Sequence, residues 1–94
     1  MRRVVPTAFP APLVTDLKDL GRAVRAARTT AGLRAKDAAI MLDMATQTLL
    51  AIETGQSSVS LDKVFAAVRG LGVDLLIIPR AQRDRVLRRL AERP

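Results

Sequence analysis

The chain has 94 residues, with sixteen Lys and Arg against nine Asp and Glu and a formal net charge of +7. This length supports one domain with a modest hydrophobic core. The sequence contains no Cys and no His, which excludes disulfides, thiolate nucleophiles, imidazole bases and the usual zinc sites. Because the acidic residues are scattered and form no paired-carboxylate pattern, we expect no enzymatic activity, no metal and no cofactor.

The positive charge favours an anionic partner, and nucleic acid is the commonest one for a small helical domain. A merely soluble basic protein is the alternative. No apolar run approaches the ~18 residues that a membrane span requires. Pro6, Pro10 and Pro12 interrupt what would have to be the apolar region of a signal peptide. We therefore expect a cytoplasmic protein with no membrane partner.

The chain divides into four segments. Residues 1–14 are rich in Pro and lack a helical period, which predicts an extended N-terminal arm. Residues 15–72 repeat apolar side chains at three- and four-residue intervals and predict four helices, of which the first has Thr15 and the fourth Ser60 as its N-cap. Residues 73–79 predict a strand. Residues 80–94 are a basic tail whose apolar spacing is compatible with a short helix. The tail is either a solvated end or a source of phosphate or protein contacts.

The segment from Leu33 to Gly55 predicts two short helices joined by a tight turn, the arrangement that places a second helix in the major groove of DNA. Ala38 and Ala39 let one helix lie close against the other, and Gly55 stands where a helix needs a left-handed C-terminal residue. Apolar spacing predicts one small core, with Leu33, Leu42, Met44, Leu49 and Ile52 contributed by this segment. The fourth helix adds a stripe of Leu61, Val64, Phe65, Val68 and Leu71.

The predicted strand is short and apolar except for Asp74, and it lies between Gly72 and Pro79. A lone strand cannot satisfy its own backbone groups, so it must pair. The simplest partner is the same strand in a second copy, related by a two-fold axis. We therefore expect a mainly α fold of four to five helices with a short C-terminal strand that pairs across a homodimer. The expected dimer contacts are Val73, Leu75, Leu76, Ile77 and Ile78.

With these residues in view, the chain resembles the Xre (Cro and repressor-like) helix-turn-helix family from about Asp16 to Leu71. The shared pattern is Arg28, Gly32-Leu33, Ala39, Leu42, Leu49, Ile52-Glu53 and Gly55. The ending from Leu71 to Pro79 is similar to that of HipB-like antitoxins. The resemblance implies a lambda-repressor-like domain in a homodimer that binds palindromic operator DNA and represses its own operon. It also implies the antitoxin of a type II toxin–antitoxin system, which neutralises a HipA-like kinase toxin.

The resemblance also implies roles for single residues. Arg28 pairs with Glu53 and ties the first helix to the recognition helix, although Arg28 as a phosphate contact is the rival interpretation. Ala35 stands where the family often has a phosphate-binding Gln, so neighbouring Arg34 and Lys36 take that contact. Gln47 suits a bidentate adenine contact. The complete set of expected DNA contacts is Arg34, Lys36, Thr46, Gln47, Thr48, Leu50, Ala51, Gln56 and Ser57.

Several alternatives stay open from the sequence. Thr46 and Thr48 are either base contacts or ordinary residues at a helix start. Ile40 and Met41 are apolar on the outer face of the second helix, where they form either extra core or a patch for a partner protein. The function is either that of the antitoxin, or that of a stand-alone Xre-family regulator without a toxin. A pure interaction module that has lost DNA binding is the third possibility.

Overall fold

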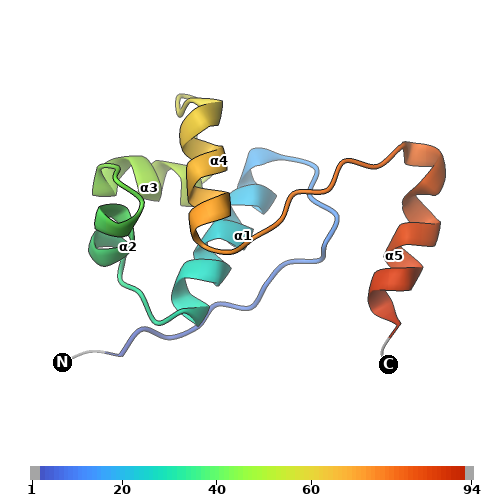
Figure 1. Cartoon of the computed structure of the whole chain (residues 1–94), viewed down its shortest axis with the longest axis horizontal. Coiled ribbons are helices and arrows are strands. Elements are labelled where there is room, and N and C mark those ends of the chain that lie inside the picture. Colours follow the sequence, from blue (N-terminus) through green and yellow to red (C-terminus); the bar gives the residue numbers. More distant parts are fainter. Residues whose placement is uncertain (1–2, 93–94) are drawn as a thin grey trace.

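The computed structural model describes residues 3–92, which form five α-helices and one short 3₁₀ helix. Figure 1 shows α1 to α4 gathered in one body, with α5 apart from them along the 43 Å longest axis. The chain is therefore mainly helical, as predicted. The elements in order are α1 (Leu17–Thr30), α2 (Ala35–Met41), α3 (Thr46–Glu53), α4 (Leu61–Gly70), η1 (Arg80–Gln82) and α5 (Arg83–Ala91).

The helix ends follow local capping chemistry. Ser60 caps α4 as predicted, since its hydroxyl accepts a 3.4 Å hydrogen bond from the Lys63 N–H. The prediction for α1 is wrong by one residue: Asp16 is the N-cap, and its carboxylate accepts a 2.8 Å hydrogen bond from the Asp19 N–H. A carboxylate at this position stabilises the positive end of the helix more than the neutral hydroxyl of Thr15 does.

Glycine is required after α3 for two reasons. Gly55 has a φ of +78°, a conformation that residues with a Cβ adopt at a cost. A Cβ at this position would also lie 2.9 Å from the Lys18 backbone nitrogen. The Gln56 N–H donates to the Ala51 carbonyl at 2.9 Å and closes the helix end. Gly55 therefore has the role that its position in the sequence predicts.

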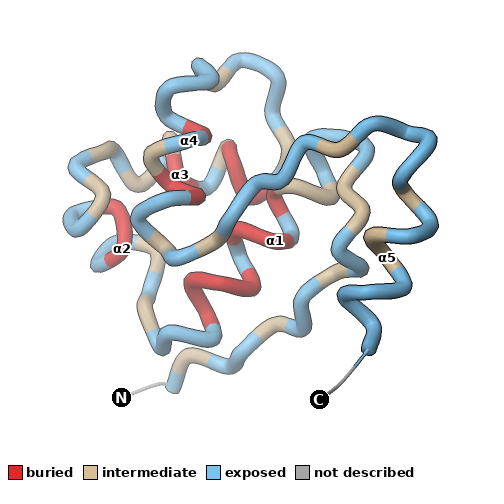
Figure 2. Tube along the Cα trace, turned by 45° about the vertical axis from the view of Figure 1, so that its right-hand side comes forward, coloured by how far each residue is buried: buried red, intermediate tan, exposed pale blue. Residues whose placement is uncertain are grey.

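The core is formed by residues of α1, α2, α3 and α4, and α3 packs against each of the other three helices of this body. Figure 2 shows the buried positions on all four helices. The predicted core residues Leu49 and Ile52 are buried, while Leu33, Leu42 and Met44 are half-buried and pack against the core. The buried cluster consists of Val24, Ala38, Ala39, Leu49, Ile52, Val64, Ala67 and Val68.

Two residues of the stripe predicted for α4 lie outside the core. Leu61 is 66% exposed and Phe65 is 41% exposed. The buried face of α4 is formed by Val64, Ala67 and Val68. The helix is therefore oriented so that Leu61 and Phe65 point away from the core. An apolar stripe can be wider than the face that neighbouring helices cover, and α4 is such a case.

The predicted strand at 73–79 is not confirmed in the single chain. No strand is assigned anywhere between residues 3 and 92, and residues 73–79 run as an extended connection from α4 to η1. A strand exists only when a neighbouring strand completes its hydrogen bonds, and the single chain supplies none here. Leu75, Leu76 and Ile77 are 45%, 70% and 96% exposed. The segment therefore exposes apolar side chains that are accessible to another chain.

The two ends of the described chain differ. Residues 3–14 form an arm without helix or strand, whereas η1 and α5 give the tail the short helix that its sequence allows. Positions 1–2 of the predicted arm and 93–94 of the predicted tail lie outside the described residues. Within residues 3–92, every helix is too short or too polar to cross a membrane.

Candidate nucleic-acid interface

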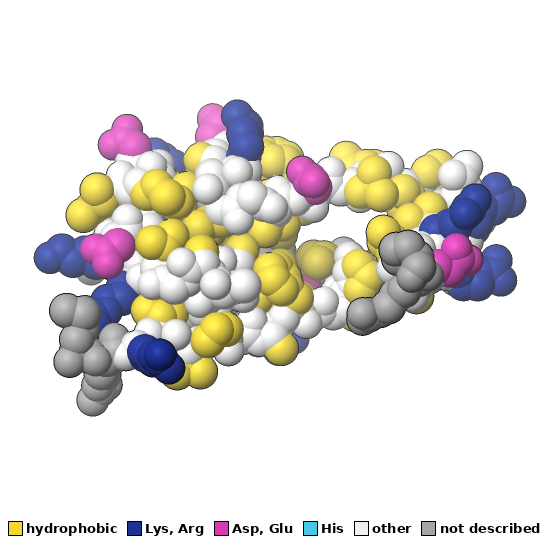
Figure 3. All heavy atoms as spheres, turned by 60° about the horizontal axis from the view of Figure 1, so that its bottom comes forward, with side chains coloured by type: hydrophobic (Ala, Val, Ile, Leu, Met, Phe, Trp, Pro, Cys, Tyr) yellow, Lys and Arg dark blue, Asp and Glu magenta, His cyan; other side chains and the backbone are white. Residues whose placement is uncertain are grey.

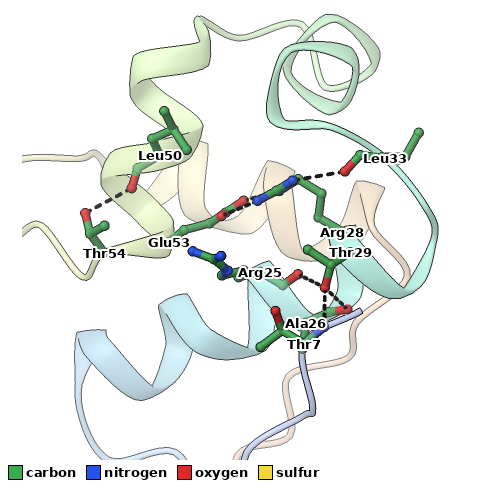
Figure 4. A network of polar contacts seen from close by, with 9 residues as sticks. All are labelled: Thr7, Arg25, Ala26, Arg28, Thr29, Leu33, Leu50, Glu53 and Thr54. Carbon is green, nitrogen blue, oxygen red and sulfur yellow. Dashed lines mark hydrogen bonds and ion pairs between the residues drawn. The ribbon is translucent and has the colours of Figure 1, made fainter. Parts of the chain in front are cut away.

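A buried ion pair joins α1 to α3. Arg28 Nε lies 2.6 Å from Glu53 Oε2, and Arg28 Nη2 donates to Glu53 Oε1 at 2.9 Å (Figure 4). The side chains are 9% and 2% exposed. Arg28 Nη1 donates to the Leu33 carbonyl at 2.9 Å, so one guanidinium links α1, α3 and the loop before α2. A buried guanidinium with these partners is not available to a phosphate, which favours the structural role.

The turn between α2 and α3 fixes the angle of the helix pair. Asp43 has a φ of +55°, and Asp is among the few non-glycine residues that tolerate this left-handed conformation. The Met44 N–H donates to the Ala39 carbonyl at 3.0 Å. Ala38 and Ala39 are buried and carry only a methyl group, so α2 lies close to α3. These two helices and their turn are the helix-turn-helix unit that the sequence predicts.

The first turn of α3 carries polar side chains into an open groove. Gln47 is exposed, Thr46 and Thr48 are half-buried, and Ala45 caps the helix without a side-chain hydrogen bond. The groove has a volume of about 330 Å³ and is lined by Gln47, Thr48, Ala51, Ser58, Val59, Ser60 and Lys63. It therefore combines an amide, hydroxyls and an ammonium group, the groups that contact base edges and phosphates.

Four of these lining residues were not predicted as site residues: Ser58, Val59, Ser60 and Lys63. The sequence identifies Ser60 only as a helix cap, whereas Ser58 and Lys63 have no local pattern that marks them. Lys63 lies in the first turn of α4, three positions after that cap. Its place beside Gln47 follows from the packing of α4 against α3. The sequence shows only that Lys63 follows the Ser-rich loop by one helical turn.

The other predicted contacts lie around this groove rather than in it. Gln56 and Ser57 are exposed in the loop after α3, and Leu50 is 43% exposed on α3. Arg34 and Lys36 are exposed at the start of α2, where Arg34 lines a second groove. Figure 3 shows Lys and Arg side chains gathered at both ends of the molecule, over α5 and at the opposite end. The predicted residues thus fall into one group on and after α3 and a second group at the start of α2.

The comparison with known families agrees with this geometry. A model described as a helix-turn-helix domain matches residues 19–86, which is more than two thirds of the chain. The match runs from α1 into α5. The chain therefore belongs to the helix-turn-helix domain family, and its class is that of a DNA-binding regulator. No curated protein matches the chain.

Replacing Glu53 tests the ion pair. We expect Glu53→Ala to lower the free energy of unfolding by about 3–5 kcal/mol, because Arg28 is left buried without its partner. DNA binding should weaken as well, since α3 loses its link to α1. Thermal unfolding followed by circular dichroism gives the first quantity, and a DNA titration gives the second.

A matched surface pair provides the control. Arg89 and Glu92 lie 3.9 Å apart with 80% and 66% of their side chains exposed, so Glu92→Ala should change stability by less than about 1 kcal/mol. If Glu53→Ala leaves the chain unfolded, the double variant Arg28→Met/Glu53→Leu should recover most of the stability, because neither charge then stays unpaired. Weakened DNA binding with an unchanged melting temperature would contradict the structural role.

Proposed function

We propose that the protein is a sequence-specific transcription regulator that binds double-stranded operator DNA with the first turn of α3 in the major groove. The observation that carries this proposal is the groove beside α3. Gln47 and Thr48 share it with Lys63 and the hydroxyls of Ser58 and Ser60. An amide that reads bases and a cation that binds phosphate therefore face the same side, as simultaneous contact with a base edge and the backbone requires.

The scaffold and the charge support the same function. The ion pair between Arg28 and Glu53 and the packing of three helices against α3 hold the recognition helix rigidly. Rigid placement matters because a base contact depends on hydrogen-bond geometry within a few tenths of an ångström. The net charge of +7 attracts the polyanion and makes its binding sensitive to salt.

We propose further that the regulator acts as a homodimer. Few residues of α3 can read bases, and a second copy doubles that number on a palindromic site. The extended segment 73–79 offers exposed Leu75, Leu76 and Ile77 to the same segment of a second copy. Antiparallel pairing of the two segments would complete backbone hydrogen bonds and cover these side chains.

The finer proposal is that this regulator is the antitoxin of a HipBA-like type II system. It is supported by the resemblance of the ending Leu71–Pro79 to HipB-like antitoxins. The exposure of two neighbouring apolar side chains on α2, Ile40 (70%) and Met41 (53%), also supports it, since such side chains are available to a protein partner. The alternative is a stand-alone Xre-family regulator without a toxin.

Gln47 is the residue that tests base reading. Gln47→Ala should weaken binding to the DNA upstream of the protein's own coding sequence by ~1–3 kcal/mol, because a bidentate base contact is lost. Binding to a random duplex of equal length should stay nearly unchanged, as should both affinities of the control Gln82→Ala. Equal losses on the two duplexes would show that Gln47 does not read bases. Affinity that hardly changes with salt would instead favour an interaction module that does not bind DNA.

Charges placed in the segment 73–79 test the homodimer. The double variant Leu76→Asp/Ile77→Asp should raise the dimer dissociation constant at least about tenfold, because like charges would meet across the two-fold axis. Both side chains are exposed in the single chain, so its melting behaviour should not suffer. Sedimentation equilibrium measures the constant, with Leu90→Asp on α5 as the control. A wild-type chain that stays monomeric at high concentration would contradict the proposal.

Co-purification separates the antitoxin from the stand-alone regulator. Tagged protein should retain the product of the adjoining reading frame through gel filtration, and that product should be a kinase-like protein. Ile40→Asp should weaken this complex while operator binding persists. A tagged protein that binds its operator but retains no neighbouring product would leave the stand-alone regulator.

A further inference from the structure

The N-terminal arm does not hang free but lies against the helix-turn-helix body. Figures 1 and 2 show the arm passing below α1 toward the loop that leads into α2. Its first described residues enter a groove of about 770 Å³ that is lined by Arg3, Val4, Val5, Pro6, Gly32, Arg34 and Asp37. The groove therefore brings the first described residues of the arm next to the loop before α2 and the first turn of α2.

A buried threonine anchors the arm. The Thr7 backbone N–H donates a 2.8 Å hydrogen bond to the Thr29 hydroxyl oxygen, and this hydroxyl donates to the Arg25 carbonyl at 2.9 Å (Figure 4). Thr29 is only 4% exposed. Pro6 restricts the backbone immediately before the anchor. The four residues from Arg3 to Pro6 are thus directed into the groove at little additional loss of conformational entropy.

The groove carries positive charge at the start of the helix-turn-helix unit. Arg3 and Arg34 line it from the arm and from the loop before α2, with Asp37 as the acidic residue between them. Both arginines are exposed. Arg34 stands at the start of α2 and is one of the phosphate contacts that the resemblance implies. Arg3 brings a second guanidinium to the same groove, and arginine binds phosphate well because of its planar set of donors.

We propose that the N-terminal arm is a second DNA-binding element in which Arg3 contacts a backbone phosphate beside the loop between α1 and α2. This inference rests on the proposed DNA-binding function and extends it from the helix-turn-helix to the arm. A phosphate contact carries no sequence information, so the arm adds affinity and not base selectivity.

Salt-dependent titrations with DNA test this role of Arg3. Arg3→Ala should weaken binding to the upstream DNA and to a random duplex equally, by about three- to tenfold. The slope of log affinity against log salt should become shallower by about 0.9, the value for one lost phosphate contact. Arg22→Ala is the control, because Arg22 is an exposed arginine of α1 paired with Asp19 at 3.2 Å, and its slope should match that of the wild type.

Releasing the anchor provides an independent variant. Thr29→Val keeps the shape of the side chain but removes the acceptor for the Thr7 N–H, so it should reproduce part of the Arg3→Ala loss. If Arg3→Ala leaves affinity and slope unchanged while Gln47→Ala still weakens specific binding, the arm proposal is wrong and the proposed function stands. If Arg3→Ala weakens only a protein complex, the groove belongs to a protein partner and the proposal is wrong. A wild-type chain that binds neither duplex would overturn both proposals.

Discussion

The orientation of α3 depends on the buried ion pair between Arg28 and Glu53. The pair joins the last turn of α1 to the last residue of α3, and its third hydrogen bond reaches the Leu33 carbonyl before α2. One side chain thereby sets the relative positions of three elements. Burying two charges is costly unless each hydrogen-bonds fully, and no buried side-chain polar atom among the described residues lacks a partner.

Small residues allow the helices to use this constraint. A Cβ at Gly21 would lie 2.5 Å from the carbonyl oxygens of Ile52 and Glu53, so α1 approaches the backbone of α3 as closely as glycine permits. Ala38 and Ala39 do the same between α2 and α3. The resulting body is thin but rigid, and it leaves the first turn of α3 exposed. A larger residue at Gly21 would displace the end of the helix that Glu53 anchors.

Local chemistry made much of this structure predictable from the sequence. Ser60 and Gly55 mark helix ends through capping and a positive φ, and Arg28 and Glu53 were paired through the family pattern. Packing was harder to predict: the stripe of α4 includes Leu61 and Phe65, yet the helix is rotated so that both are exposed. The groove partner Lys63 and the arm residue Arg3 reach their places through tertiary contacts, which no local pattern encodes. The strand predicted at 73–79 is not found among the described residues, because the single chain offers this segment no partner strand.

The central claim is that two copies of this helix-turn-helix body present their α3 helices to one DNA duplex. The most direct measurement is selection of bound duplexes from a random pool by the full chain, followed by sequencing. The account predicts an enriched inverted repeat with half-sites centred about 10 bp apart, one turn of the double helix. Recovery of a pool with no enriched sequence, or of a single half-site without its inverted copy, would contradict it.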